Sequence, residues 1–292
     1  MQSPTAGDVL ARLSQFPGFQ PQSIEPLTGG MIAAVYKVTL AEGRNLVVKA
    51  GDTESRLDIE GDMLRHLAQV SGLPLPPLIH SEPDLLVLGH VKGSSDLDER
   101  AQEHAAELLA ALHSVTWTHF GHTEDTLIGP LHQPNPPSSS WVDFFREQRL
   151  LYMAHEALQA RAITTSLCVR IETLASHLER WLDEARQPVL VHGDVWATNL
   201  LASEGRITAF LDPAIYYAHE EIELAYTTLF GSRGRTFGDS FYRRYHELRP
   251  IAPGFFEERR HIYNLYPLLV HARVFGRHYP DEVARTLDRF GY

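Results

Sequence analysis

Three oxygen-bearing side chains lie in and just beyond the segment 192–199, HGDVWATN. They are Asp194, Asn199 five residues later, and Asp212 after the next predicted strand. An acid, an asparagine and a second acid in this order form the set that phosphoryl transfer requires. Asp194 can accept a hydrogen bond from an attacking hydroxyl, while Asn199 and Asp212 offer the hard oxygen ligands that Mg²⁺ prefers. The alternative is that Asp194 and Asn199 only cap turns, because both residue types favour turns.

Lys49 supports the phosphoryl-transfer interpretation. It is one of only three lysines in 292 residues, and it ends the apolar strand segment 46–49. Burying an ammonium group without a partner is costly, and Glu60 follows 11 residues later within a predicted helix. A strand lysine paired with a helix glutamate holds the ATP phosphates in protein-kinase-like folds. The alternative, a lysine of an edge strand that reaches solvent, agrees less well with a chain so poor in lysine.

Gly29 and Gly30 directly precede the predicted hairpin that carries Lys49. Because glycine has no Cβ, backbone amides there can approach a phosphate group closely. Two adjacent glycines more often mark a plain turn, and the full Gly-x-Gly-x-x-Gly pattern is not present. Their position ahead of the hairpin favours the phosphate-binding interpretation.

The hydrophobic pattern predicts the elements that position these residues. We expect helices at 6–16, 54–70, 97–115, 141–160 and 166–185, strands at 33–40, 46–49, 85–88, 189–191 and 207–211, and a loop at 121–140. After residue 211 we expect helices to the end of the chain. Strands dominate the first third of the chain and helices the rest. We therefore expect an α+β, two-lobed protein-kinase-like fold. Its small N-terminal lobe, an antiparallel β-sheet with a helix, is expected at 1–88, a hinge at 89–93, and a larger, mainly helical lobe at 94–292.

Composition excludes several classes of protein. Asp and Glu number 37 against 26 Lys and Arg, for a net charge of −11, which argues against a partner that is nucleic acid or an anionic membrane. No apolar run approaches the length of about 18 residues that a membrane span needs. The single cysteine, Cys168, excludes disulfide frameworks, and we see no signal peptide, so we expect a cytoplasmic protein.

Motifs along nearly the whole chain resemble the fructosamine kinase (ketosamine-3-kinase) family. Asp-Pro-Ala at 212–214 and Trp196 directly after Asp-Val are the most specific of these motifs. The others are Lys49, Glu60, Gln133-Pro134-Asn135, 141–145 (WVDFF), Arg149, 192–196 (HGDVW), 229–231 (LFG), 263–266 (YNLY), 275–276 (FG) and Tyr279. The resemblance implies ATP-dependent phosphorylation of the sugar O3 of ketosamines, with Mg²⁺ as the second cofactor, and it implies a ketosamine substrate that is a small molecule or is bound to a protein.

The resemblance also implies a role for each matching residue. Asp194 would be the base, Asn199 and Asp212 the metal ligands, and Lys49 with Glu60 the phosphate clamp. Three hinge residues would meet adenine through their backbone: Gly89, His90 and Val91. Three residues would lie at the substrate face, where Trp196 would stack on the sugar: Trp196, His219 and Glu221.

The chain departs from the family pattern at three places. Gly89 replaces the usual acid of the hinge, Ala197-Thr198 replaces Ser-Gly, and Glu220 replaces a basic residue near the expected substrate face. The last change leaves open which ketosamine is accepted. One alternative activity is an aminoglycoside or amino-alcohol phosphotransferase on the same fold, and an alternative of another class is a non-catalytic nucleotide-binding scaffold. We expect a monomer, with a dimer as the alternative.

Overall fold

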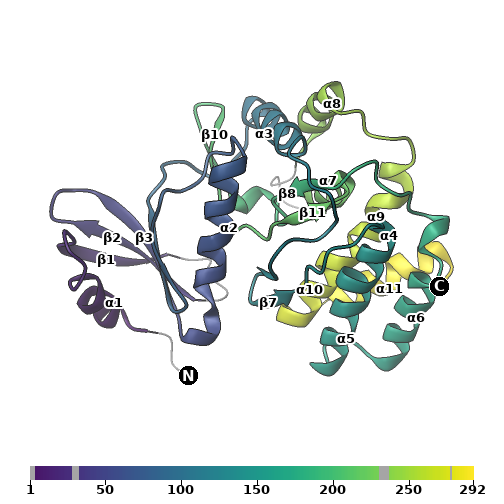
Figure 1. The fold of residues 1–292 in the computed structure, drawn as a ribbon, viewed down its shortest axis with the longest axis horizontal. Coiled ribbons are helices and arrows are strands. Elements are labelled where there is room, and N and C mark those ends of the chain that lie inside the picture. The colour runs from purple at the N-terminus through teal and green to yellow at the C-terminus, as the bar shows by residue number, and fades with distance from the viewer. Residues whose placement is uncertain (1–3, 28–32, 230–236, 277) are drawn as a thin grey trace.

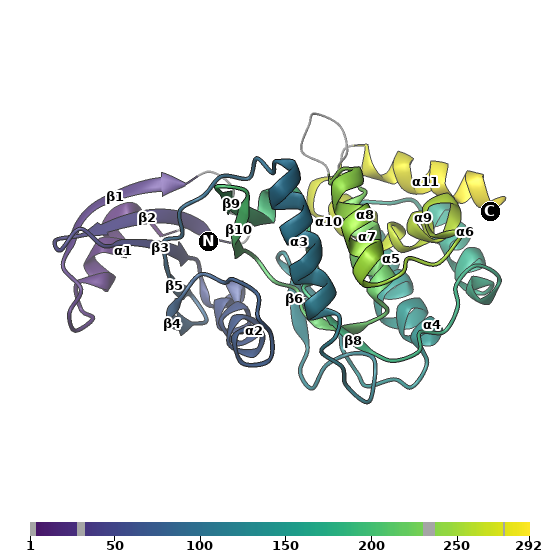
Figure 2. The same ribbon diagram turned by 90° about the horizontal axis from the view of Figure 1, so that it is seen from above.

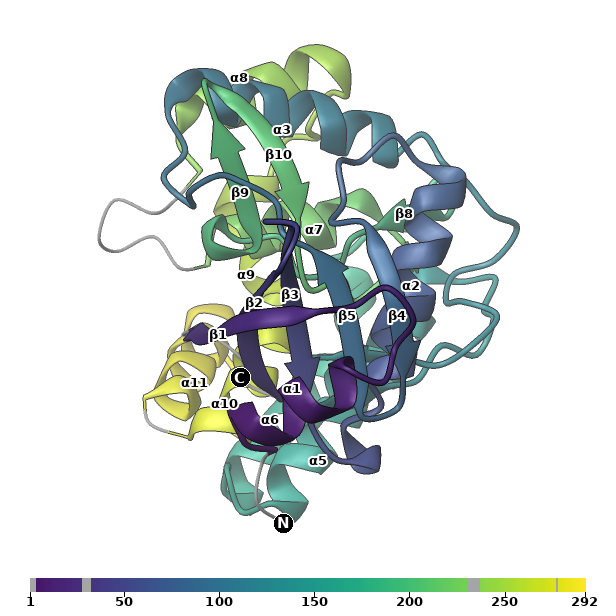
Figure 3. The same ribbon diagram turned by 90° about the vertical axis from the view of Figure 1, so that its left-hand side faces the viewer.

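The computed structural model describes residues 4–27, 33–229, 237–276 and 278–292, and it has two lobes (Figure 1). The N-terminal lobe contains a five-stranded antiparallel sheet in the order β1-β2-β3-β5-β4. Its strands are β1 (Pro21–Leu27), β2 (Ala34–Leu40), β3 (Asn45–Ala50), β4 (Leu78–Glu82) and β5 (Leu85–Gly89). Helix α1 (Ala6–Leu13) crosses one face of this sheet (Figure 3), and α2 (Leu57–Val70) packs on the other.

The two-residue period of the strands decides which side chains meet which helix. Leu46 and Val48 of β3 pack in the same cluster as Val9 and Leu13 of α1. Val47 and Lys49 therefore point to the opposite face, where α2 lies, and Val47 packs in the cluster of Leu57 and Leu64. The alternation of this one strand thus directs the Lys49 ammonium toward α2.

The C-terminal lobe is mainly helical and holds the largest hydrophobic core. Its helices are α3 (Glu99–Leu112), α4 (Trp141–Phe144), the π-helical turn η2 (Phe145–Leu151), α5 (Tyr152–Gln159), α6 (Thr165–Ala175), α7 (Glu220–Thr227), α8 (Asp239–Leu248), the π-helical turn η5 (Phe255–Arg259), α9 (Arg260–Tyr263), α10 (Leu265–Phe275) and α11 (Tyr279–Phe290). Three two-stranded pairs complete it: β6 (Thr126–Ile128) with β7 (Leu131–Gln133), β8 (Val189–Val191) with β11 (Tyr216–Ala218), and β9 (Leu200–Ser203) with β10 (Arg206–Phe210). The β9–β10 hairpin lies between the N-terminal sheet and α3 (Figure 2).

The structure confirms the predicted α+β, two-lobed fold class and the strands and helices of its first half. Three expectations were wrong. The segment predicted as a loop at 121–140 contains β6 and β7, the helix predicted at 166–185 is α6 and ends at Ala175, and the chain after 211 is not all helical, because β11 pairs with β8. Strand β1 was not predicted, since it carries Pro21 and Pro26 and is largely exposed at the sheet edge. No helix of the described residues has both the length and the apolar character of a membrane span.

Candidate active site

Lys49 joins the two lobes. Its Nζ lies 2.7 Å from Oε1 of Glu60 on α2 and 2.5 Å from Oδ1 of Asp212, which follows β10 in the other lobe. The Lys49 and Glu60 side chains are 14% and 7% exposed, whereas that of Asp212 is 49% exposed. Gly61 lets α2 approach the sheet this closely, because a Cβ there would lie 2.1 Å from Oγ of Ser81.

The charges of this triad stabilise one another. Burial alone would lower the pKa of Lys49, but Asp212 and Glu60 raise it above its usual value, so the ammonium stays charged. Burial raises the pKa of Glu60 and outweighs the opposing effect of Lys49. For Asp212, Lys49 outweighs burial and lowers the pKa. A cation thus stands between two carboxylates, one of which is open to solvent.

Asp194 follows β8 in a loop whose backbone leaves no room for a side chain at Gly193. Gly193 has a φ of +86°, and a Cβ there would lie 2.1 Å from the carbonyl oxygen of Ala214. The Ala214 amide donates to the His192 carbonyl at 2.8 Å, so the loop is tied to the chain just after Asp212. This close contact sets the separation between the two acids.

Asn199 lies beside Asp194. Its Nδ2 donates to the Asp194 carboxylate at 2.8 Å and to the Asp194 carbonyl at 3.0 Å. The amide therefore directs its nitrogen toward the acid and keeps Oδ1 for another partner. The Leu211 amide donates to the Asn199 carbonyl at 2.8 Å, which brings Asn199 next to Asp212.

Asp212 has a left-handed backbone, with a φ of +53°. Such a conformation is strained for a residue with a side chain and is concentrated at functional sites. The β9–β10 hairpin carries Asn199 just before its first strand and Asp212 shortly after its second. Their carboxylate and amide oxygens form a donor set that fits Mg²⁺.

Glu223 on α7 holds the loop of residues 192–194, which carries Asp194 and is called the catalytic loop below. This role of Glu223 was not predicted from the sequence. Its carboxylate accepts hydrogen bonds from the backbone amides of Gly193 at 2.7 Å and His192 at 3.2 Å. It also lies 2.9 Å from Nε2 of His113, whose Nδ1 lies 2.6 Å from the Tyr245 hydroxyl. Burial would raise the pKa of Glu223, but the hydrogen bond with His113 contributes most to lowering it.

Tyr226, one helical turn further along α7, was also not predicted. It is buried, and its hydroxyl hydrogen-bonds to Asp194. Burial raises the pKa of Asp194 to about 7, although the bonds from Tyr226 and Asn199 act in the opposite direction. For Glu223, the sequence did contain a signal: it is an acid among the apolar residues of α7. Because Glu is almost never fully buried without a partner, this position could have indicated a buried carboxylate with polar partners.

The hinge residues form the end of β5 and the segment after it. The Gly89 amide donates to the Pro77 carbonyl at 2.8 Å, and the His90 amide to the Asn45 carbonyl at 3.2 Å. Within the described chain, no backbone carbonyl accepts from the Val91 amide. Among the three residues predicted to meet adenine, Val91 is therefore the one whose N–H is available to a ligand.

The remaining predicted site residues occupy different surroundings. Trp196 is partly exposed two residues after Asp194. His219 caps α7 by accepting from the Glu221 amide at 3.2 Å. Glu221 is buried, and its two oxygens pair with Arg259 at 2.6 and 2.7 Å. Gly29 and Gly30 lie outside the described residues.

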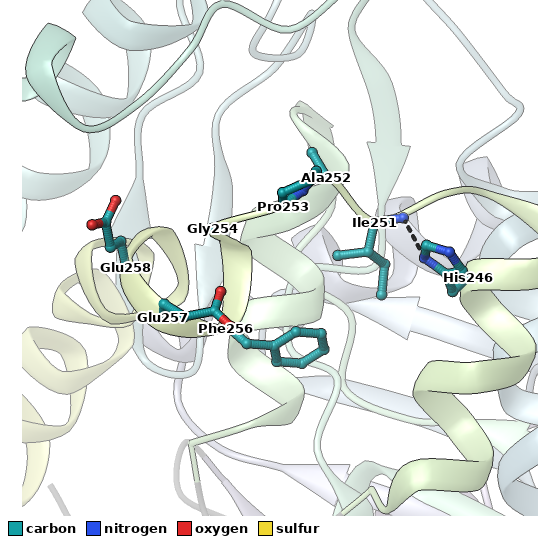
Figure 4. A pocket seen from close by; sticks show the side chains of 8 residues that line it. All are labelled: His246, Ile251, Ala252, Pro253, Gly254, Phe256, Glu257 and Glu258. Atoms are coloured by element: carbon teal, nitrogen blue, oxygen red, sulfur yellow. Dashed lines mark hydrogen bonds between the residues drawn. The ribbon is translucent and has the colours of Figure 1, made fainter.

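The hollow shown in Figure 4 is separate from these residues. It has a volume of about 630 Å³ and lies between the end of α8 and η5. Its walls are formed by His246, Ile251, Ala252, Pro253, Gly254, Phe256, Glu257 and Glu258. None of the predicted catalytic, nucleotide-binding or metal residues lines it, so we assign it no role in catalysis.

Comparisons of the sequence with a family model and with individual proteins point to the same family. A family model described as fructosamine kinase matches residues 7–290. A protein of Vibrio vulnificus described as a probable ketoamine kinase is 30% identical over 273 residues, which cover 90% of each chain. A chloroplastic protein-ribulosamine 3-kinase of Arabidopsis thaliana is 32% identical over 194 residues, which cover 65% of this chain and 57% of that protein.

Comparison with solved structures points the same way. A Thermobifida fusca protein described as a putative fructosamine-3-kinase has a TM-score of 0.83 at 29% identity, over 98% of this chain and 100% of that one. An aminoglycoside phosphotransferase, crystallised with AMP-PNP and hygromycin B, has a TM-score of 0.67 at 19% identity over 96% and 95% of the two chains. The second likeness shows the fold alone.

Proposed function

The chain belongs to the fructosamine kinase family, and from this we propose that it uses ATP to phosphorylate the O3 hydroxyl of ketosamines, the Amadori products of amines with sugars. The observation that carries this proposal is the convergence of groups from both lobes. Lys49 Nζ lies 2.5 Å from Asp212, while Asn199, tied by its carbonyl to Leu211, hydrogen-bonds to Asp194. A non-catalytic scaffold would not need these three oxygen donors together.

We assign the nucleotide to the cleft between the lobes. Lys49 would contact the ATP phosphates and Glu60 would hold its ammonium in place, since that pair is already formed at 2.7 Å. The Val91 amide would donate to adenine. Asn199 Oδ1 and the half-exposed Asp212 carboxylate would hold Mg²⁺, whose contribution is to neutralise charge on the transferring phosphate.

Asp194 would act on the acceptor. The O3 oxygen attacks the γ-phosphorus, the bond from that phosphorus to the β,γ-bridging oxygen breaks, ADP leaves, and Asp194 takes the O3 proton. Tyr226 and Asn199 would orient the carboxylate through their hydrogen bonds to it. Enolisation between C1 and C2 then expels the phosphate from C3 and leaves the nitrogen bound to C1 as an imine. Water hydrolyses this imine to the free amine and a 3-deoxy-2-oxoaldehyde, which repairs the glycated molecule.

Trp196 and His219 are our proposed substrate contacts. Trp196 is partly exposed and follows the base by two residues, where an aromatic face can stack on a sugar. The same role for Glu221 stays a prediction, and because both its oxygens pair with Arg259, it would act by fixing the start of α7. A monomer in the cytoplasm is likewise our proposal.

A phosphorylation assay tests the proposed function. Purified protein is incubated with ATP, Mg²⁺ and a panel of ribulosamines, erythrulosamines, fructosamines and aminoglycosides. We expect ADP formation and O3-phosphorylated product with at least one ketosamine, and loss of about 10³-fold or more in the Asp194→Asn variant. Phosphate transfer to aminoglycosides but to no ketosamine would refute the proposed repair function. Unchanged turnover in Asp194→Asn would refute the assignment of the base.

A further inference from the structure

A second cluster of metal-ligating side chains lies in the C-terminal lobe, on α5 and α6. It consists of His155, Cys168 and Glu172, and one ligand atom from each lies within 4.8 Å of the other two. His155 Nε2 is 3.0 Å from Oε1 of Glu172, and Cys168 Sγ is 3.8 Å from the same oxygen. None of the residues assigned above to nucleotide binding, to the base or to Mg²⁺ belongs to this cluster.

The helices present these three groups in a way that suits a metal ion. Cys168 and Glu172 are four residues apart on α6, so their side chains lie one above the other on one face of that helix. His155 comes from α5, which packs beside α6 (Figure 1). Two ligands from one helix and a third from its neighbour cross-link the two elements.

We propose that His155, Cys168 and Glu172 bind one Zn²⁺ ion, with water as the fourth ligand. A thiolate, an imidazole and a carboxylate are the three ligand types that Zn²⁺ takes in proteins. In tetrahedral coordination the ligand atoms lie about 3.4–3.6 Å apart, given bonds of about 2.0–2.3 Å. The distances of the Glu172 oxygen from His155 Nε2 (3.0 Å) and from Cys168 Sγ (3.8 Å) are close to this range. Small changes in side-chain torsions would bring the three ligand atoms to tetrahedral separations.

The surroundings of the cluster provide both a dry side and an entry path. Cys168 is 2% exposed, whereas the side chains of His155 and Glu172 are 50% and 46% exposed. A metal ion can therefore arrive from solvent past the two outer ligands and have its sulfur bond shielded by the core. Mg²⁺ prefers oxygen ligands, so the thiolate and imidazole select Zn²⁺ here and keep this site distinct from the catalytic one.

Hydrogen bonds to the Glu172 carboxylate link the three side chains when no metal is bound. Burial, with a further contribution from Glu172, raises the pKa of the Cys168 thiol. The S–H and the Nε2–H can then both point to the Glu172 carboxylate. Binding of Zn²⁺ releases the thiol proton to solvent and requires His155 to carry its proton on Nδ1, so that the lone pair of Nε2 faces the metal.

Cobalt spectroscopy of the full chain tests the site, because Cys168 is the only cysteine. Co²⁺ is added to chelator-treated protein. We expect a near-ultraviolet thiolate-to-cobalt charge-transfer band together with visible bands of tetrahedral Co²⁺, which saturate at one ion per chain and disappear when Zn²⁺ is added. Cys168→Ser should lose the charge-transfer band, and His155→Asn and Glu172→Gln should each weaken Co²⁺ binding about tenfold or more.

A matched control is available on α11. His278, the N-cap residue of that helix, lies 3.2 Å from Glu282 in a His–Glu pair that has no cysteine beside it, so His278→Asn should leave the cobalt spectrum unchanged. Circular dichroism and kinase turnover verify that each variant is folded, because none of the substituted residues belongs to the proposed catalytic site. Absence of the charge-transfer band in the wild-type chain, or cobalt affinity unaltered in His155→Asn, would overturn the proposal even where Cys168→Ser fails to fold.

Discussion

Asp194 combines burial with hydrogen bonds that oppose its effect. Removal from water raises the pKa of this carboxyl to about 7, the nearby Asp212 charge adds to this, and Tyr226 and Asn199 act against it. A general base works best with a pKa near the operating pH. The residue is thereby a stronger proton acceptor than an exposed aspartate, whose usual pKa is about 3.9.

The first prediction is a pH limb in the kinase reaction. Protonated Asp194 cannot accept the O3 proton, so kcat/KM should fall tenfold per unit as pH decreases through the pKa. That pKa is about 7 in the free protein, and a bound Mg²⁺ would move the limb to lower pH. Measurement of kcat/KM from pH 5 to 9 checks this. Rates that are independent of pH from 5 to 7 would contradict the role of Asp194.

The second prediction concerns Lys49. Lys49→Ala should lower kcat/KM for ATP about 10²–10³-fold, because the cation that pairs with both Glu60 and Asp212 is lost. Lys37→Ala is the control, since Lys37 lies on the neighbouring strand β2 and forms an ion pair with Glu25 at 3.8 Å, away from Glu60 and Asp212. Steady-state kinetics with varied ATP distinguish the two variants. Equal kinetics for Lys49→Ala and the wild type would refute the phosphate clamp.

At the scale of elements, the sequence revealed those parts of the site that depend on local order. The apolar segment 46–49 predicted β3 and the helical spacing of 54–70 predicted α2. A lysine in such an apolar strand needs a partner, which predicted the pair of Lys49 with Glu60. The sequence could indicate that Glu223 is buried but not which groups it contacts, because it lies 31 residues from His192 and reaches that loop only when α7 packs against β8. Strand β11 has three residues, too few to show a period.

The third prediction tests how α7 holds the catalytic loop. Glu223→Gln replaces one accepting oxygen by an NH₂ group, so one of the hydrogen bonds from the His192 and Gly193 amides is lost. We expect kcat to fall about 10–100-fold, KM for ATP to change less, and the free energy of unfolding to fall by about 1–3 kcal/mol.

Glu247→Gln is the control for that variant, because Glu247 is exposed on α8 and, among the described residues, its ion pair is with Arg244 of the same helix, at 2.9 Å. Kinetics and urea unfolding of both variants provide the comparison. A variant Glu223→Gln that loses stability but keeps full kcat would show that the loop is positioned without this carboxylate.

At the scale of the whole molecule, the electrostatic field and the contacts between lobes govern ligand binding. A net charge of −11 repels ATP, so positive charge must be concentrated locally at Lys49 and the metal ion. Lys49 and Asp212 form one contact across the cleft. A second contact joins His66 of α2 to His122, whose ring centroids lie 4.9 Å apart, and His122 stacks on Tyr217.

The fourth prediction is that acid weakens this second contact. Burial lowers the pKa of His66, and burial together with the charge of His66 lowers the pKa of His122. The unfolded chain, with a histidine pKa of about 6.5, thus binds more protons than the folded one below that pH. The stability that the pair contributes is complete above about pH 6.5 and is lost as pH falls through the lowered pKa values.

Urea unfolding at several pH values between 5 and 8 measures this effect. The free energy of unfolding of the wild type should decrease from pH 7.5 to 5 by more than that of the double variant His66→Asn/His122→Asn, in which two positive rings can no longer face each other across the lobes. Other buried histidines, such as His271, contribute equally to both proteins and cancel in the difference. The exposed His278→Asn variant should follow the wild type. Identical pH dependence in the wild type and the double variant would show that this histidine pair does not couple lobe packing to pH.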